Sequence, residues 1–93
     1  MFGWLKKRLV DRWIKELKAN IDGMRKMSRD YREMGGFKEV ADILEKHQAG
    51  ELVPYELLAE GRKRELEFAD VCEKLADVYE KLLDHIKSAV EKA

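Results

Sequence analysis

The clearest indication of the fold comes from FADVCEKLADVYEKLLDHIKSAV, residues 68–90, in which apolar residues return at alternating steps of four and three. This spacing is the period of an α-helix that keeps one side against a partner. The apolar positions are Phe68, Cys72, Leu75, Tyr79, Leu82, Ile86 and Ala89, widened by Val71, Ala76, Val78, Leu83 and Val90. The stretch therefore predicts an amphipathic helix with a long apolar stripe that must be buried.

Residues 4–34 follow the same rhythm, which predicts a second long amphipathic helix. Its apolar half holds Leu5, Leu9, Val10, Trp13, Ile14, Leu17, Ile21, Met24, Met27, Tyr31 and Met34. Gly23 weakens a helix by about 1 kcal/mol relative to Ala, so a kink there is the alternative to a continuous helix. Asn20 falls within the apolar half. It either occupies a loosely packed position or is a buried polar residue that fixes register or partner number.

The segment between these helices predicts a short third helix. Gly35 and Gly36 end the first helix, because glycine tolerates the conformation that closes helix termini. A helix at about 37–48 follows, and Pro54 suits the first turn of the next one. That last helix is expected over about 54–91. It is either continuous, because no capping residue marks a new start, or bent or broken near Gly61.

The predicted fold class is all-α. We expect one helical domain over residues 1–93: a small bundle of two long amphipathic helices and one short connecting helix. The composition agrees, since 45% of the 93 residues are hydrophobic. The charged share of 41%, against about 25% in average proteins, is balanced between 19 basic and 19 acidic residues. Many charged residues with one Asn, one Gln and no Thr resemble a thermophile composition.

Helix lengths suggest that one chain cannot bury its own stripes. At 1.5 Å per residue the first helix is about 45 Å long, the connecting helix about 18 Å, and an unbroken last helix about 55–60 Å. These lengths predict apolar surface left over for a second copy or another protein. A sharp bend at Gly61 would instead let the two long helices pair antiparallel within one molecule, capped by the short segments.

The leading functional prediction is a non-enzymatic, coiled-coil-like module for protein interaction or self-assembly. The expected partner is a second copy, with a dimer favoured, or another helical protein. The residues expected to make this contact are Phe2, Trp4, Leu5, Leu9, Trp13, Val71, Leu75, Val78, Leu82 and Ile86.

Nucleic-acid binding is the first alternative, because residues 1–34 carry ten basic and five acidic side chains. A basic stripe is the electrostatic footprint of phosphate binding. The candidate residues are Lys7, Arg8, Arg12, Lys15, Arg25, Lys26 and Arg29. The competing interpretation is a solvated helix face that pairs with acidic neighbours, and the neutral net charge of the whole chain favours it.

Attachment to a membrane surface is the second alternative. Phe2, Trp4, Leu5 and Leu9, flanked by basic residues, suit a helix that lies in the plane of the interface. No signal peptide or membrane span is expected. The single cysteine, Cys72, excludes an internal disulfide, and a cytoplasmic location is expected.

No catalytic, cofactor or metal site is expected. His47 and His85 lack the Glu-x-x-His spacing of metal sites in helical bundles. Cys72 lies in the middle of the apolar stripe, where a thiol acts as a small hydrophobic group. No glycine-rich phosphate loop or nucleophile–base set is present in the sequence.

Overall fold

The chain forms a long helical hairpin. The computed structural model describes residues 2–92, except the side chain of Phe2. Helix α1 (Phe2–Met34) is followed by α2 (Gly36–Lys46), a single 3-10 turn, η1 (Gly50–Leu52), and α3 (Tyr55–Lys92). Within residues 2–92 all the regular secondary structure is helical, as predicted. The predicted ranges 4–34, 37–48 and 54–91 end within two residues of the observed helix ends.

Both long helices are continuous through their internal glycines. Helix α1 runs through Gly23 and α3 runs through Gly61. Gly61 has a packing role instead: a Cβ at this position would overlap the aromatic ring of Phe37. Its lack of a side chain lets α2 approach α3 closely.

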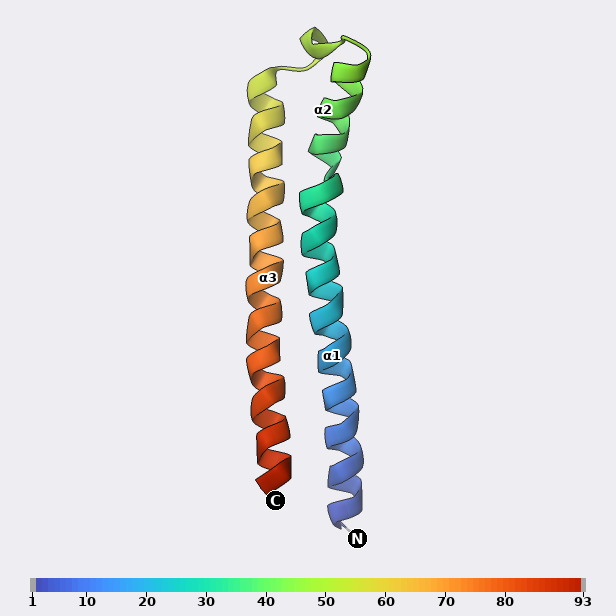
Figure 1. The fold of residues 1–93 in the computed structure, drawn as a ribbon, viewed down its shortest axis with the longest axis vertical. Helices are drawn as coiled ribbons and strands as arrows, with labels where there is room; N and C mark the ends of the chain where they lie inside the picture. The colour runs from blue at the N-terminus through green and yellow to red at the C-terminus, as the bar shows by residue number, and fades with distance from the viewer. Residues whose placement is uncertain (1, 93) are drawn as a thin grey trace.

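The cap expected for a chain that bends sharply at Gly61 is not observed, because α3 is continuous there. Helix α2 does not cap the end of the long helices; it continues the direction of α1, and α1 and α2 together lie along the full length of α3 (Figure 1). The unbroken last helix therefore does not leave the mismatch in length that was predicted from the sequence. About 66 Å of helix in α1 and α2 lies beside about 57 Å in α3, at 1.5 Å per residue.

The hairpin is not a compact bundle. Its Cα atoms extend over 69 × 16 × 14 Å, with a radius of gyration of 20.3 Å. A compact domain of this length has a radius of gyration of about 12 Å. The predicted bundle fails within one chain because two helices side by side form one layer, whereas a bundle encloses its core with helices on every side.

The contact between α1 and α3, called the seam below, is narrow. Its buried hydrophobic residues are Ile21, Ala69, Cys72, Ala76 and Leu83. Ile14, Leu17, Met24 and Tyr79 pack against them while staying half-buried. Because α3 contributes mainly small residues, the helices lie close together, but they enclose few large side chains. The burial of Cys72 confirms its predicted place in the stripe.

The connection between α2 and α3 is tight and depends on one residue with a left-handed backbone. Gln48 has φ 54°, and the Ala49 amide donates to the carbonyl of Leu44 at 2.8 Å. Glycine would fit this conformation better, yet Gly50 comes two residues later and opens η1. Val53 then returns the chain, in extended conformation, to the start of α3.

Candidate interaction surface

The direction of α2 is set by two charged residues of α3 that lie one turn apart. Arg62 donates from Nη1 to the carbonyl of Tyr31 at 2.6 Å and from Nη2 to the carbonyl of Arg32. These carbonyls belong to the last turn of α1, which lacks partners within its own helix. Arg62 therefore caps the C-terminus of α1 from a neighbouring helix.

Glu65 caps the start of α2 in the same way. Its Oε1 accepts the amide of Phe37 at 2.6 Å, and its Oε2 accepts Nη1 of Arg62 at 3.0 Å. A carboxylate at a helix N-terminus satisfies a free amide and is stabilised by the helix dipole. Gly35 makes room for it, because a Cβ on Gly35 would overlap the Glu65 carboxylate. We call Arg62, Glu65 and Gly35 the junction, which holds α2 in line with α1.

One side of the hairpin carries a row of ion pairs, called the ion-pair side. Arg25 lies within 2.5–3.5 Å of carboxylate oxygens of Glu73, Asp77 and Glu80. Arg32 pairs with Asp70 at 2.7 Å and with Glu73 at 2.9 Å. Buried Ser28 adds a hydrogen bond of 3.2 Å to Glu73.

These contacts affect the ionisation of both arginines. Hydrogen bonds to Asp77 and then Glu80 raise the pKa of Arg25 above its ordinary value. A hydrogen bond to Asp70, with a smaller contribution from Glu73, raises the pKa of Arg32 despite the opposing effect of desolvation. The guanidinium groups therefore stay charged, and they pair α1 with α3 in one register.

The opposite side of the hairpin is apolar and exposed. On a helix wheel its residues fall about 100° from the seam on both helices. Tyr31 and Phe68 make an edge-to-face contact, with ring centroids 4.9 Å apart. The exposed apolar residues of α1 and those of α3 therefore lie on the same side of the hairpin. All ten residues of this apolar face are at least 36% exposed: Leu9, Trp13, Met27, Tyr31 and Met34 of α1, and Phe68, Val71, Leu75, Val78 and Leu82 of α3.

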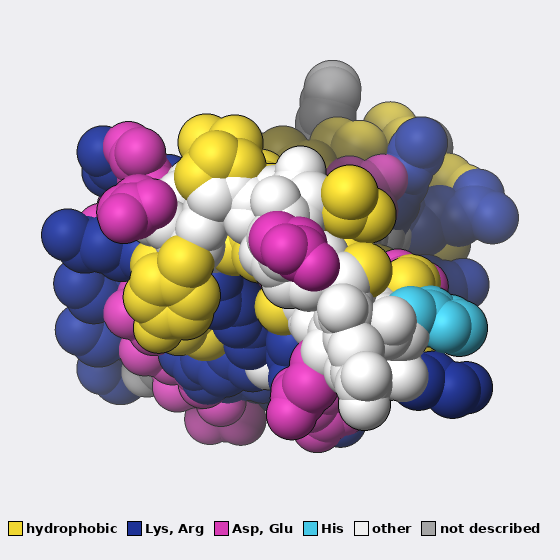
Figure 2. All heavy atoms as spheres, turned by 90° about the horizontal axis from the view of Figure 1, so that it is seen from above, with side chains coloured by type: hydrophobic (Ala, Val, Ile, Leu, Met, Phe, Trp, Pro, Cys, Tyr) yellow, Lys and Arg dark blue, Asp and Glu magenta, His cyan; other side chains and the backbone are white. Residues whose placement is uncertain are grey.

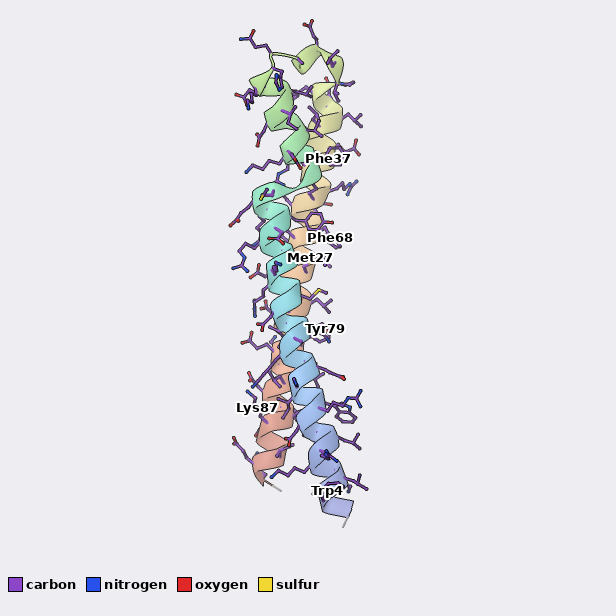
Figure 3. All side chains as sticks on the ribbon, turned by 90° about the vertical axis from the view of Figure 1, so that its right-hand side faces the viewer. Trp4, Met27, Phe37, Phe68, Tyr79 and Lys87 are labelled. Carbon is purple, nitrogen blue, oxygen red and sulfur yellow. The ribbon has the colours of Figure 1, made fainter. Side chains whose placement is uncertain are left out.

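The figures show this division into two sides. In Figure 3, Met27 and Phe68 lie toward one edge of the hairpin and Lys87 toward the other. Figure 2 looks along the hairpin from its connection end. Hydrophobic side chains gather toward the upper edge, and charged side chains dominate the lower edge. The surface of the hairpin is therefore strongly two-sided.

Open grooves lie where the two helices are less tightly packed. Near the chain ends, a groove of about 680 Å³ is lined by residues that include Val10, Trp13, Ile86 and Ala89. A neighbouring groove of about 360 Å³ contains Trp13, Asn20 and Leu82. Trp13 borders both grooves, so the apolar surface continues from α1 across the seam to α3.

The predicted interaction residues lie at several places on the hairpin. Trp13, Val71, Leu75, Val78 and Leu82 lie on the apolar face with Leu9, and Leu5 lies at its edge. Ile86 is half-buried beside Trp13. Trp4 points away from this face and is 61% exposed, with the guanidinium of Arg8 5.0 Å from its ring centre. The prediction for the side chain of Phe2 lies outside the described part of the structure.

The candidate residues for nucleic-acid binding fall into two groups: some are paired or stacked with neighbouring side chains, and others are exposed. Arg25 is held by three carboxylates, Arg12 pairs with Glu16 at 3.2 Å, and Arg8 stacks on Trp4. Lys7, Lys15, Lys26 and Arg29 are exposed on α1. Because Arg25 belongs to the ion-pair side, the predicted basic stripe is interrupted in its middle. This pattern follows the competing interpretation, in which basic residues pair with acidic neighbours.

The junction was not predicted from the sequence, in which neither Arg62 nor Glu65 was assigned a role. A charged residue on an apolar stripe, level with a glycine pair on the partner helix, was the available signal. The role of such a charged residue depends on which residues lie opposite it, and only the tertiary structure shows which these are.

Among residues 2–92 no group of three or more His, Cys, Asp or Glu side chains is placed to hold a metal ion. None of the helices in that range has an apolar stretch sufficient to cross a membrane. Comparison with protein-family models, curated proteins and solved structures gave no match. The surface of the hairpin is therefore the candidate functional site.

Proposed function

We propose that the protein is a non-enzymatic helical module that works by self-association, with a dimer as the basic unit. The observation that carries this proposal is the apolar face, to which both long helices contribute. A run of exposed large hydrophobic side chains along one side of a protein marks an interaction site. On this proposal residues 1–93 act as one domain, and the free Cys72 thiol fits the reducing cytoplasm.

The amount of exposed surface supports the proposal. The chain exposes 7767 Å², about 2,000 Å² more than the roughly 5,600 Å² expected for a compact protein of its mass. A standard stable interface removes about 800 Å² from each partner, and permanent dimers remove more. The surplus is therefore large enough for a permanent dimer interface.

The small buried core gives a second reason. Only five hydrophobic residues are buried in the described chain, and two of them are alanines. Small domains have little stability to spare and often complete their core by oligomerisation. Pairing two apolar faces would give four helices around a shared core, an arrangement in which each helix buries a broad stripe.

Substitution on the apolar face tests this function. We expect wild-type protein at micromolar concentration to have twice the chain mass of 10.9 kDa by light scattering. Val78→Lys places a charge in the middle of the face and should shift the mass toward the monomer. A wild-type protein that remains monomeric would contradict the proposal.

Leu66→Lys is the matched control. Leu66 is an exposed hydrophobic residue of the same helix, but it lies one turn from Arg62 and Asp70, toward the ion-pair side. We expect this variant to keep the wild-type mass. If both variants dissociate equally, the apolar face is not the specific contact.

A further inference from the structure

The apolar face has a recess on α1. Between Trp13 and Met27 the positions that point toward this face are Glu16, Asn20 and Gly23, none of which has a large hydrophobic side chain. Apart from its two chain neighbours and the nearby backbone of α1, no atom lies within 4 Å of the place where a Cβ of Gly23 would be. Two turns of α1 therefore present a shallow surface between bulky groups.

Large exposed hydrophobic side chains of α3 lie at the same level of the hairpin as the recess of α1. The register follows from Arg25 beside Asp77, and from Asn20 and Leu82 in one groove. It sets Val78 and Leu82 beside the recess of α1, whereas Leu75 and Val71 lie level with Met27 and Tyr31. Val78 and Leu82 are 58% and 47% exposed, so they form a ridge next to the recess.

Near the chain ends the large side chains belong to α1 and the small ones to α3. There α1 contributes Leu9 and Trp13, which are 51% and 54% exposed. At this level α3 contributes the small side chain of Ala89, which lines the open groove with Trp13. Large residues of one helix thus lie level with small residues of the other at two successive places.

From this alternation, which rests on the proposed function, we infer the geometry of the dimer. Two copies pack apolar face to apolar face around a two-fold axis parallel to the hairpin. In that arrangement α1 of each copy lies antiparallel against α3 of the other, and both connections lie at the same end. The Val78–Leu82 ridge of each copy fills the Asn20–Gly23 recess of the other, while Trp13 meets the surface around Ala89.

The other two-fold arrangement of these faces is less favourable. With the axis across the hairpin, the copies run in opposite directions, and α1 meets α1 while α3 meets α3. Near the axis the α3 ridge would then meet its own copy, and bulky side chains would oppose one another. Close packing favours ridges that enter recesses, because both voids and overlaps are costly.

A distance measurement between spin labels distinguishes the arrangements. Gln48→Cys places a label at the connection end, in a Cys72→Ala background checked for wild-type helicity and mass. Because packed helices are 8–10 Å apart, the inferred dimer gives a distance of about 20–30 Å, including the label arms. A distance approaching the 69 Å length of the hairpin would overturn the inferred geometry while leaving self-association intact.

Filling the recess gives a second test that leaves Cys72 in place. Gly23→Leu should raise the dimer dissociation constant on the order of tenfold by overpacking, while helix content stays the same or increases. The control is Asp22→Leu, an exposed position on the outer side of the same turn, which should leave the constant unchanged. Undiminished association of Gly23→Leu would overturn the inference. A wild-type monomer would overturn the proposed function itself.

Discussion

At the scale of single residues, the junction is the most specific feature of the hairpin. Glu65 is 9% exposed and has partners in two directions: the amide that opens α2 and the guanidinium that closes α1. Burying a carboxylate costs free energy unless it is paired and hydrogen-bonded, and here both conditions are met. A single side chain thereby fixes the relative direction of two helices.

Removal of the Glu65 carboxylate should destabilise the protein. We expect Glu65→Ala to lower the free energy of unfolding by about 1–3 kcal/mol, because a helix cap is lost and half-buried Arg62 loses its acidic partner. Urea unfolding at one fixed protein concentration measures the effect. The concentration must be fixed, since association contributes to apparent stability.

Glu67→Ala is the control for that prediction. Glu67 pairs with Arg64 at 3.0 Å and with the same three-residue spacing, but its side chain is 48% exposed, against 10% for Glu65. Exposed pairs of this kind contribute about 0–1 kcal/mol. Equal losses from both substitutions would show that Glu65 is an ordinary surface pair and that the junction has no special role.

At the scale of helices, the ion-pair side aligns α1 with α3. Arg25 and Arg32 lie two turns apart on α1 and face four carboxylates of α3. Sliding α3 by one turn would separate several of these pairs at once. The pairs therefore select a register that the small residues of the seam specify only weakly.

Neutralising the two arginines should reduce stability in a manner that depends on salt. We expect the double variant Arg25→Met, Arg32→Met to melt at a lower temperature than wild type in low salt, with the difference shrinking in molar salt because exposed charges are screened. Arg12→Met, which breaks an exposed pair within α1, should have a smaller effect. A difference that does not change with salt would mean that packing of the side chains dominates.

The raised pKa values of the arginines determine the sign of the pH dependence. A group with a raised pKa in the folded state stabilises that state at all pH values below its unfolded pKa, and this contribution is lost only as pH rises through the folded pKa. From neutral to mildly alkaline pH both guanidinium groups stay protonated. We therefore expect their contribution to stability to be constant over that range.

At the scale of the whole molecule, the surface has opposite characters on its two sides. The ion-pair side satisfies its charges within one chain, whereas the apolar face has no partner within residues 2–92. The apolar face stays exposed because the apolar stripe of each long helix is too wide, and not too long, for a single neighbouring helix to cover. Each long helix is apolar over about half of its circumference, but contact with a single neighbour covers a narrower strip.

Tryptophan fluorescence should report the covering of this face. Trp13 lies on the apolar face, whereas Trp4 points away and contacts Arg8. We expect the emission of Trp4→Phe to shift to the blue as protein concentration rises, because Trp13 becomes buried. Trp13→Phe, which retains Trp4, should show little shift. A concentration-dependent shift carried by Trp4 would place the contact elsewhere.

The same signal separates the membrane alternative from self-association. If anionic vesicles cause a blue shift at a concentration where the protein is monomeric, the N-terminal segment binds lipid surfaces. An unchanged spectrum with vesicles, together with a shift on concentration, supports contact between copies.

The sequence by itself determined the helices and which residues form their apolar halves. Apolar periodicity is local, so Phe68 through Val90 identify a stripe without reference to any other part of the chain. The Gly35–Gly36 pair likewise located the break between α1 and α2, but not for the expected reason: Gly35 has φ −56° and ψ 151°, which is not left-handed, and a glycine is needed there to make room for Glu65.

Only the tertiary structure decided which part of each stripe becomes the seam and which part stays exposed. Ile21 and Trp13 belong to the same apolar half of α1, yet one is buried and the other is 54% exposed. It also decided that α2 extends α1, because that direction depends on Arg62 and Glu65, nearly thirty residues away. Periodicity gives the direction of a side chain around its own helix axis, whereas burial depends on where the neighbouring helix lies.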